Sequence, residues 1–175
     1  TTSELWHNHP EKAFGMRADW VDANPNSTQA LIMAVMEAQM YCEDPANREE
    51  VAKICSKRRW INAPFKDVVE RMKGNFDYGT GRVVENSPYK SHDKWFLTED
   101  IRWGYLPADL DMDAWVDKVN REDLWRSAAA SLGVPAAQIP TSTSRGIEKF
   151  FDGKTFDPEN PQAYLDSLAI KAIRA

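Results

Sequence analysis

The stretch that decides the fold runs from His9 to Asp22 and has the sequence HPEKAFGMRADWVD. Its middle part, Ala13 to Arg17, is the one plausible β-strand of the sequence, although residues 11–21 can equally form a single helix. A lone strand needs partners to hydrogen-bond with. One strand followed by many helices therefore indicates part of a larger α/β protein whose sheet lies elsewhere.

Downstream of this stretch the chain has a series of helix start signals, so residues 24–175 are predicted to be mainly helical. Three starts are prolines, which suit the first turn because the missing N–H needs no partner there. The expected helices begin at Pro25, Pro45 and Pro64, and the later ones cover Thr98–Trp103, Asp111–Val119, Asn120–Leu132, Ser144–Phe151 and Pro161–Ile170. Gly74 is expected to end the third helix, and residues 76–84 to form a loop. Asn120 with Asp123 resembles a capping box.

Composition excludes several classes of protein. With 42% hydrophobic residues and seven Trp, the chain can bury a core, and most of the Trp are expected to pack there. A net charge of −5 argues against a nucleic-acid binder, and the basic run Lys57–Arg59 beside Trp60 is interpreted as a helix end. No run approaches the ~18 apolar residues of a membrane span, and Thr1 opens no signal peptide.

The two cysteines, Cys42 and Cys55, have no metal-site spacing and are predicted to be buried thiols on apolar helix faces. A disulfide between neighbouring helices stays open for an oxidising compartment. His7 and His9 lie two residues apart, so neither a helix nor a strand brings them together with a further ligand set. No metal site is expected.

Other polar clusters also lack the spacing of a known chemistry. The run Asp109–Asp113 starts like a calcium loop but lacks its later Gly and Glu, and is interpreted as the start of a helix. The hydroxyls of Ser142 and Ser144 and the imidazole of His92 have no nucleophile motif around them. The segment Thr141–Gly146 can bind an anion or cap a helix, and the helix cap is the preferred interpretation. The sequence therefore predicts a protein that is not an enzyme and holds no cofactor.

Residues 9–22 resemble the nitrate-binding proteins of nitrate ABC transporters, and later motifs continue the resemblance in the same order. These motifs are Met36–Gln39, Tyr89–Asp93, Trp95–Glu99, Ile101–Gly104, Asp117–Arg126, Ser144–Glu148, Phe150–Gly153 and Phe156–Pro161. The motifs span most of the chain, and so many matches in order make the resemblance specific. It implies an α/β fold of the two-lobed periplasmic-binding-protein type. Residues 1–175 would be its C-terminal, mostly helical portion, with 13–17 as the strand that crosses back towards the first lobe.

The resemblance also implies a function. A protein of this family binds nitrate or nitrite in the periplasm and delivers it to the membrane subunits of an ABC transporter, and lipid anchoring to the membrane stays open. It has no nucleic-acid partner. Two alternatives remain: a cytoplasmic nitrate sensor or regulatory domain of a transporter ATPase, and a bicarbonate-binding receptor.

Lys12 is the one ligand residue that the resemblance assigns. It matches a nitrate-contacting lysine of the family, where the similar bicarbonate-binding proteins carry an acidic residue. A weakly basic anion needs donors and positive charge, and Lys offers three donors on a flexible stem. The family's other ligand residues lie in a portion that has no counterpart here, so this chain alone is not expected to form the complete pocket. The family also has a longer connection where residues 84–88 lead directly into Tyr89.

Overall fold

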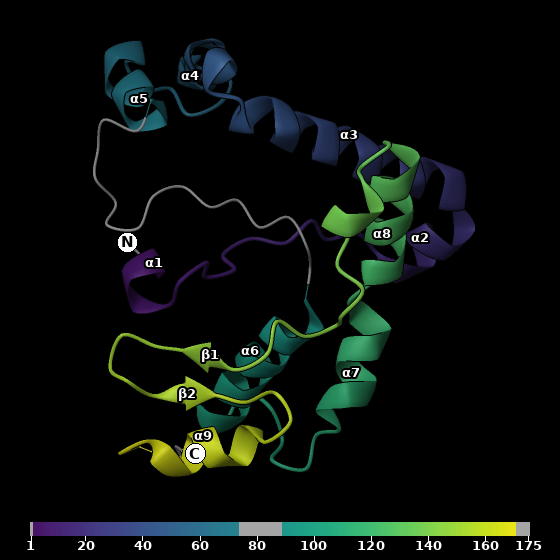
Figure 1. Cartoon of the computed structure of the whole chain (residues 1–175), viewed down its shortest axis with the longest axis vertical. Coiled ribbons are helices and arrows are strands. Elements are labelled where there is room, and N and C mark those ends of the chain that lie inside the picture. Colours follow the sequence, from purple (N-terminus) through teal and green to yellow (C-terminus); the bar gives the residue numbers. More distant parts are fainter. Residues whose placement is uncertain (1, 74–88, 171–175) are drawn as a thin grey trace.

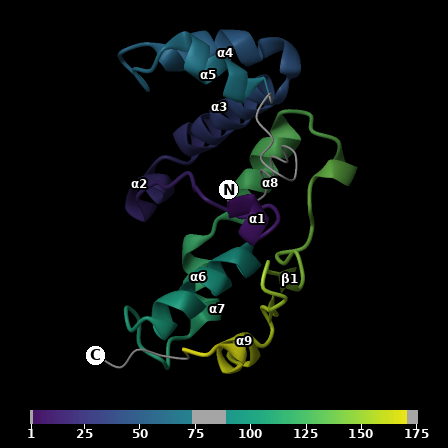
Figure 2. The same cartoon turned by 90° about the vertical axis from the view of Figure 1, so that its left-hand side faces the viewer.

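Figure 1 shows the computed structural model of the chain, which describes residues 2–73 and 89–170. The chain is elongated, with α4 (Arg48–Ser56) and α5 (Phe65–Met72) at one end and α9 (Pro161–Ser167) at the other (Figures 1 and 2). No helix in the described part of the chain has both the length and the apolar character that a membrane crossing requires. The predicted helix end at Gly74, the loop at 76–84 and the short connection at 84–88 lie outside the described residues.

The N-terminal region contains two short helices joined by a segment without regular structure. The helices are α1 (Thr2–Leu5) and α2 (Ala18–Ala23). The segment between them, residues 9–17, is termed the lysine segment. The expected strand at residues 13–17 is absent from this structure, because no described residue pairs with them and a strand requires a partner. The alternative of one helix over 11–21 is wrong, since α2 begins only at Ala18.

The next region is a helical arm that begins at Pro25, as predicted. It consists of α3 (Pro25–Glu43), the 3₁₀ turn η1 (Pro45–Asn47), α4 and α5. The side chain of Asp44 accepts a hydrogen bond from the N–H of Ala46 and so starts the turn that leads into α4. The helix predicted after Pro64 is also confirmed, because α5 follows it directly. In both views the arm extends away from the C-terminal hairpin (Figures 1 and 2).

The second half of the chain packs three helices between the arm and the C-terminus. They are α6 (Lys90–Arg102), α7 (Met112–Val119) and α8 (Glu122–Ser131), and the turn η2 (Ala136–Gln138) follows them. The prediction that a short helix starts at Thr98 is wrong. Thr98 lies inside α6, is only 1% exposed, and satisfies its hydroxyl by donating to the carbonyl of Lys94 at 2.7 Å.

The predicted capping box is also wrong. The residue that precedes α8 is Arg121, and the side chain of Asn120 instead donates to Asp93 at 2.6 Å. Asp123 accepts two hydrogen bonds from the Arg121 guanidinium. In contrast, the side chain of Asp111 caps α7 by accepting from the N–H of Ala114, which confirms the helix predicted there.

The C-terminal region forms a β-hairpin where a helix was expected over Ser144–Phe151. Strand β1 (Glu148–Lys149) pairs antiparallel with β2 (Thr155–Phe156), and α9 follows. Gly146 and Gly153 have φ of 90° and 80°, a conformation that favours turns at both ends of β1. The hairpin contacts a distant segment, because Trp6 forms a bridge with Phe150. This long-range pairing overrides the local helical pattern.

The described residues contain two small buried clusters. One joins α3 to α8 through Met36, Ala128 and Ala129, and the other packs the hairpin on α9 through Phe156, Tyr164 and Leu168. Many large apolar side chains remain exposed, and the expectation that most Trp are packed is wrong for this chain. The exposed Trp residues are Trp20, Trp60, Trp103 and Trp115. The chain therefore leaves apolar surface without cover of its own.

Candidate functional site

Lys12 lies in the middle of the lysine segment, exposed to solvent. It makes no ion pair or hydrogen bond with any described residue. The residues that fix its position are those that hold the two ends of the segment. At the C-terminal end the segment leads into α2, and at the N-terminal end it follows Trp6 and Asn8, which are tied to the opposite end of the chain.

Trp6 is the anchor of the N-terminal end. It is almost fully buried, and its indole N–H donates to Glu148 Oε2 at 2.7 Å across 142 residues of sequence. Its ring packs edge-on against His92 and Phe150. One residue earlier, the carbonyl of Leu5 accepts from the N–H of Phe151 at 2.9 Å. Both backbone and side-chain contacts therefore join the N-terminus to the hairpin.

Glu148 is the centre of a buried polar group, the Glu148 cluster, formed by Trp6, His92, Arg145 and Glu148. The guanidinium of Arg145 donates to both carboxylate oxygens, at 2.7 and 2.9 Å, and His92 Nε2 lies 3.3 Å from Oε1. Burial acts to raise the pKa of Glu148, but the hydrogen bonds from its three partners outweigh it and lower the pKa to about 2. The carboxylate therefore stays charged and fully paired at neutral pH.

Arg145 also extends this cluster to the start of the lysine segment. Its guanidinium donates to the carbonyls of His7 at 3.2 Å and Asn8 at 3.3 Å. Asn8 has a φ of 57°, a turn conformation in which the chain changes direction just before the segment. The expectation that Thr141–Gly146 caps a helix is wrong, since no helix follows it. The alternative use of Arg145 for a free anion is not supported either, because the carboxylate of Glu148 already occupies its guanidinium.

An open hollow of about 580 Å³ lies along the second half of the lysine segment. Its apolar wall comes from Phe14 and Met16 of the segment, Trp20 of α2 and Leu31 of α3. Phe14 is 52% exposed although it is a large apolar residue. Such a surface is typical of a face that another part of a protein covers. Lys12 lies two residues before this apolar wall.

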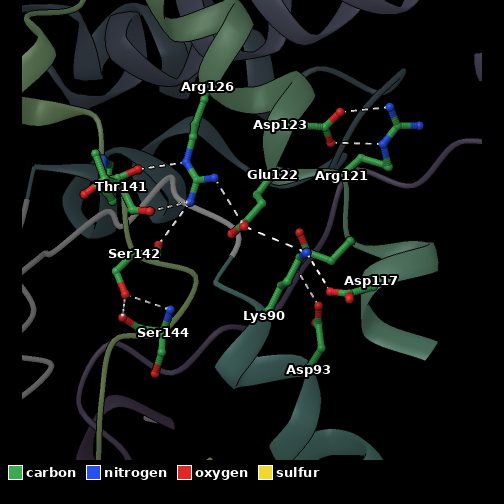
Figure 3. A network of polar contacts seen from close by, with 12 residues as sticks. Lys90, Asp93, Asp117, Arg121, Glu122, Asp123, Arg126, Thr141, Ser142 and Ser144 are labelled. Atoms are coloured by element: carbon green, nitrogen blue, oxygen red, sulfur yellow. Dashed lines mark hydrogen bonds and ion pairs between the residues drawn. The ribbon is translucent and has the colours of Figure 1, made fainter. Parts of the chain in front are cut away.

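A second polar network connects α6 and α8 with the loop that carries Thr141 and Ser142. Glu122 at the start of α8 is buried and accepts from Arg126 at 3.2 Å, with Lys90 of α6 at 3.9 Å. Figure 3 shows Arg126 between Glu122 and the loop that carries Thr141 and Ser142. Its guanidinium donates to the carbonyl of Ser142 at 3.1 Å. Because Arg126 and Lys90 both have partners, this network stabilises the fold and leaves no cation free for a ligand.

The other sequence-derived candidates have ordinary structural roles. No group of His, Cys, Asp and Glu residues within the described ranges can hold a metal ion. Cys42 and Cys55 are half-buried free thiols, so the expected full burial is not reached. The Glu148 cluster was missed because its members are far apart in sequence. His92 lies in the Tyr89–Asp93 motif, and Arg145 and Glu148 lie in the Ser144–Glu148 motif, but neither motif indicates that they meet.

Comparison with known proteins shows what this chain, with its exposed lysine segment, is similar to. The description "NMT1-like family" applies to a family that matches residues 1–56. The nitrate/nitrite binding protein NrtA of Synechocystis is 62% identical over the whole chain, which covers 42% of that relative. The bicarbonate-binding protein CmpA of Synechococcus elongatus is 46% identical over 97% of the chain, again covering 42% of the relative.

A solved structure supports the same assignment. The crystal structure of the periplasmic nitrate-binding protein NrtA from Synechocystis superposes with a TM-score of 0.88 at 61% identity, covering 97% of this chain and 48% of that one. The resemblance inferred from the sequence is thus confirmed, as is the fold class: the chain is a homologue of part of the nitrate-binding proteins. It spans about two-fifths of the length of the relatives that it matches. The relatives and the solved structure reported above are named for binding an anion, and none of these names describes an enzyme.

Proposed function

We propose that this chain is part of a receptor that binds nitrate or nitrite and delivers it to an ABC transporter, without catalysing a reaction. The observation that carries the proposal is the 62% identity to a nitrate/nitrite binding protein along the whole chain, against 46% to a bicarbonate-binding protein. The periplasm is the proposed location, because the matched structure is that of a periplasmic protein. Lipid anchoring is a further part of the proposal that rests on the family resemblance alone.

Lys12 is the proposed anion ligand. Three features of its position support this role: it is exposed, it has no described partner, and it lies two residues before Phe14, which lines the open apolar hollow. A cation that already has a carboxylate partner, as Arg145 has, binds an incoming anion only weakly, because its charge and its N–H donors are already in use. Each hydrogen bond between the ammonium and an anion contributes about 1.5–3 kcal/mol, since one partner is charged and the site is shielded when the remainder covers it.

The segment itself is proposed to gain its strand partners from the portion of the receptor that this chain lacks. Residues 13–17 are pinned at both ends but pair with no described strand. An unpaired segment of this length leaves backbone N–H and C=O groups available for a sheet edge. In such an arrangement the hollow beside Phe14 and Trp20 becomes part of the interface between this chain and the rest of the receptor.

The division of the site can be tested by joining this chain to the remainder of the Synechocystis relative. Titration calorimetry is then carried out with nitrate, nitrite and bicarbonate on the chimera and on the isolated chain. We expect the chimera to bind nitrate with a Kd in the micromolar range or tighter, about −8 kcal/mol, and the isolated chain to bind at least roughly a hundredfold more weakly. Circular dichroism confirms that both proteins are folded.

Two outcomes contradict the proposal. Tight nitrate binding by the isolated chain places the whole pocket within these 175 residues. Bicarbonate binding that is tighter than nitrate binding favours the bicarbonate receptor, the alternative that the 46% identical relative represents.

A further inference from the structure

The helical arm carries a charge pattern that the anion-receptor proposal does not use. Residues 51–66 contain five cations and no acidic residue, in a chain whose net charge is −5, so the other residues together carry −10. The cations are Lys53, Lys57, Arg58, Arg59 and Lys66. Lys53 is paired with Glu49, but the other four are exposed and form no ion pair with any described residue. Positive charge is therefore concentrated at one place on an acidic protein.

Three of these cations belong to the turn between α4 and α5, termed the basic turn (residues 57–62). The same turn displays two large apolar side chains, Trp60 at 60% and Ile61 at 62% exposed. The Arg59 guanidinium lies 5.2 Å from the centre of the Trp60 ring. Cationic and apolar groups thus face solvent together within six residues.

The backbone of the basic turn is well defined. The N–H of Ile61 donates to the carbonyl of Cys55 at 3.0 Å, and the N–H groups of Trp60 and Asn62 donate to the carbonyl of Lys57 at 2.9 and 3.2 Å. Asn62 has a φ of 54°, which turns the chain sharply towards Pro64. Because the turn is held by its own hydrogen bonds, its side chains are displayed without a large ordering cost on binding.

The turn also lies where a flat partner can reach it. It joins α4 and α5, the two helices at the end of the long axis opposite to α9, in both views (Figures 1 and 2). At 0.1 M salt charges further than about 10 Å apart are largely screened, so acidic residues outside the arm repel an anionic surface only weakly at this end. Within α4, Glu49 is paired with Lys53 and Lys73.

We propose that the basic turn is a docking site for an anionic phospholipid surface. Lys57, Arg58 and Arg59 match the negative headgroups, and Trp60 with Ile61 enters the interface between headgroups and acyl chains. Trp is enriched at that depth because its ring is apolar and its N–H is polar. Each cation near an anionic membrane raises the partition constant about fivefold, so the three together give on the order of a hundredfold.

The proposal is independent of Lys12, which lies in the lysine segment and not on the arm. An acidic protein surface is the rival partner for the same cations. We favour the lipid because a bilayer offers a continuous apolar layer below its charged headgroups, which suits Trp60 and Ile61 beside three cations.

The experiment is co-sedimentation of the chain with vesicles of phosphatidylcholine alone and with about 30% phosphatidylglycerol, at 0.1 and 0.5 M salt. The test variant is Arg58→Glu/Arg59→Glu, and its matched control is Lys118→Glu/Lys149→Glu. Both change the net charge by the same amount, and all four positions are exposed. A second pair is Trp60→Ser with Trp115→Ser as control, both replacing an exposed Trp. Circular dichroism checks that all variants fold.

We expect the chain to bind the anionic vesicles at 0.1 M salt and to be released at 0.5 M. The Arg58/Arg59 variant should bind at least tenfold more weakly, and its control within about threefold of the original chain. Equal losses of vesicle binding in the two double variants would show that binding depends only on the net charge of the chain, which would overturn the proposal. It is also overturned if the chain ignores anionic vesicles, binds neutral vesicles equally well, or binds only beads coated with polyglutamate.

Discussion

The Glu148 cluster and the lysine segment lie next to each other in the structure and differ in what they contact. In the cluster a buried carboxylate has partners on all sides, and each partner belongs to this chain. In the segment Lys12 and Phe14 are exposed, none of the described residues forms a strand with it, and an open hollow lies beside Phe14. The cluster is specified by this chain alone, whereas the segment is shaped for contacts that come from elsewhere.

We therefore expect the cluster to determine the stability of this chain and the lysine segment to matter for ligand binding by the complete receptor. A change in the cluster should alter the stability of the isolated chain. A change in the lysine segment should have little effect until the rest of the receptor is present.

The largest effect is expected for Arg145→Ala. The substitution leaves the Glu148 carboxylate buried without its main counter-charge, and breaking a buried pair in this way costs about 3–5 kcal/mol. Urea unfolding measures the loss. Arg17→Ala is the matched control, because its bidentate pair with Asp19 is exposed to solvent and such pairs contribute little to stability. Similar losses in the two variants would show that the cluster is not the stronger anchor.

Acid titration should give the next largest effect. The pKa of Glu148 is lowered from 4.5 to about 2 in the folded chain, so its stabilising contribution is present above about pH 4.5 and lost as the pH falls through 2. The linked loss is about 3 kcal/mol, as an order of magnitude. In Glu148→Gln this dependence disappears, and the difference in unfolding free energy between the two chains should shrink as the pH falls from 5 to 2. A constant difference would contradict the assigned pKa.

The smallest effect is expected for Phe14→Ser. In the isolated chain the ring is about half exposed, so its loss should change the free energy of unfolding by at most about 0.5 kcal/mol. In the chimera with the remainder of the Synechocystis relative the same ring is expected to be covered, and the loss should rise to about 1.5–3 kcal/mol. Thermal unfolding of the four proteins measures both numbers. Equal small losses would show that nothing covers the hollow.

The sequence predicted best those elements whose signal is local. The predicted start at Pro25 is correct, and Pro64 directly precedes α5, whereas Pro45 opens the 3₁₀ turn η1 ahead of α4. Proline marks such positions because its missing N–H needs no partner in the first turn of a helix. The helix predicted over Asp111–Val119 is also correct, since α7 follows Asp111 directly.

The failures have one physical cause, since each element depends on a distant partner. The start of α6 was missed because Ser91, His92 and Thr98 are buried polar residues that break the apolar period. The hairpin replaced an expected helix because β1 pairs beside Trp6, far away in the sequence. For the same reason the Glu148 cluster could not be predicted. Lys12 was singled out by family resemblance, and its isolation in the structure agrees with that role without testing it.

The central claim is that Lys12 supplies one wall of an anion site completed by another portion of the receptor. Its most direct test is nitrate titration of the chimera carrying Lys12→Glu, with Lys118→Glu as a control of equal charge change. The account predicts that nitrate affinity falls at least tenfold in the first variant, since a charged hydrogen bond is lost and a repulsive charge is added, and stays within about twofold in the second. Unchanged nitrate affinity in Lys12→Glu would contradict it.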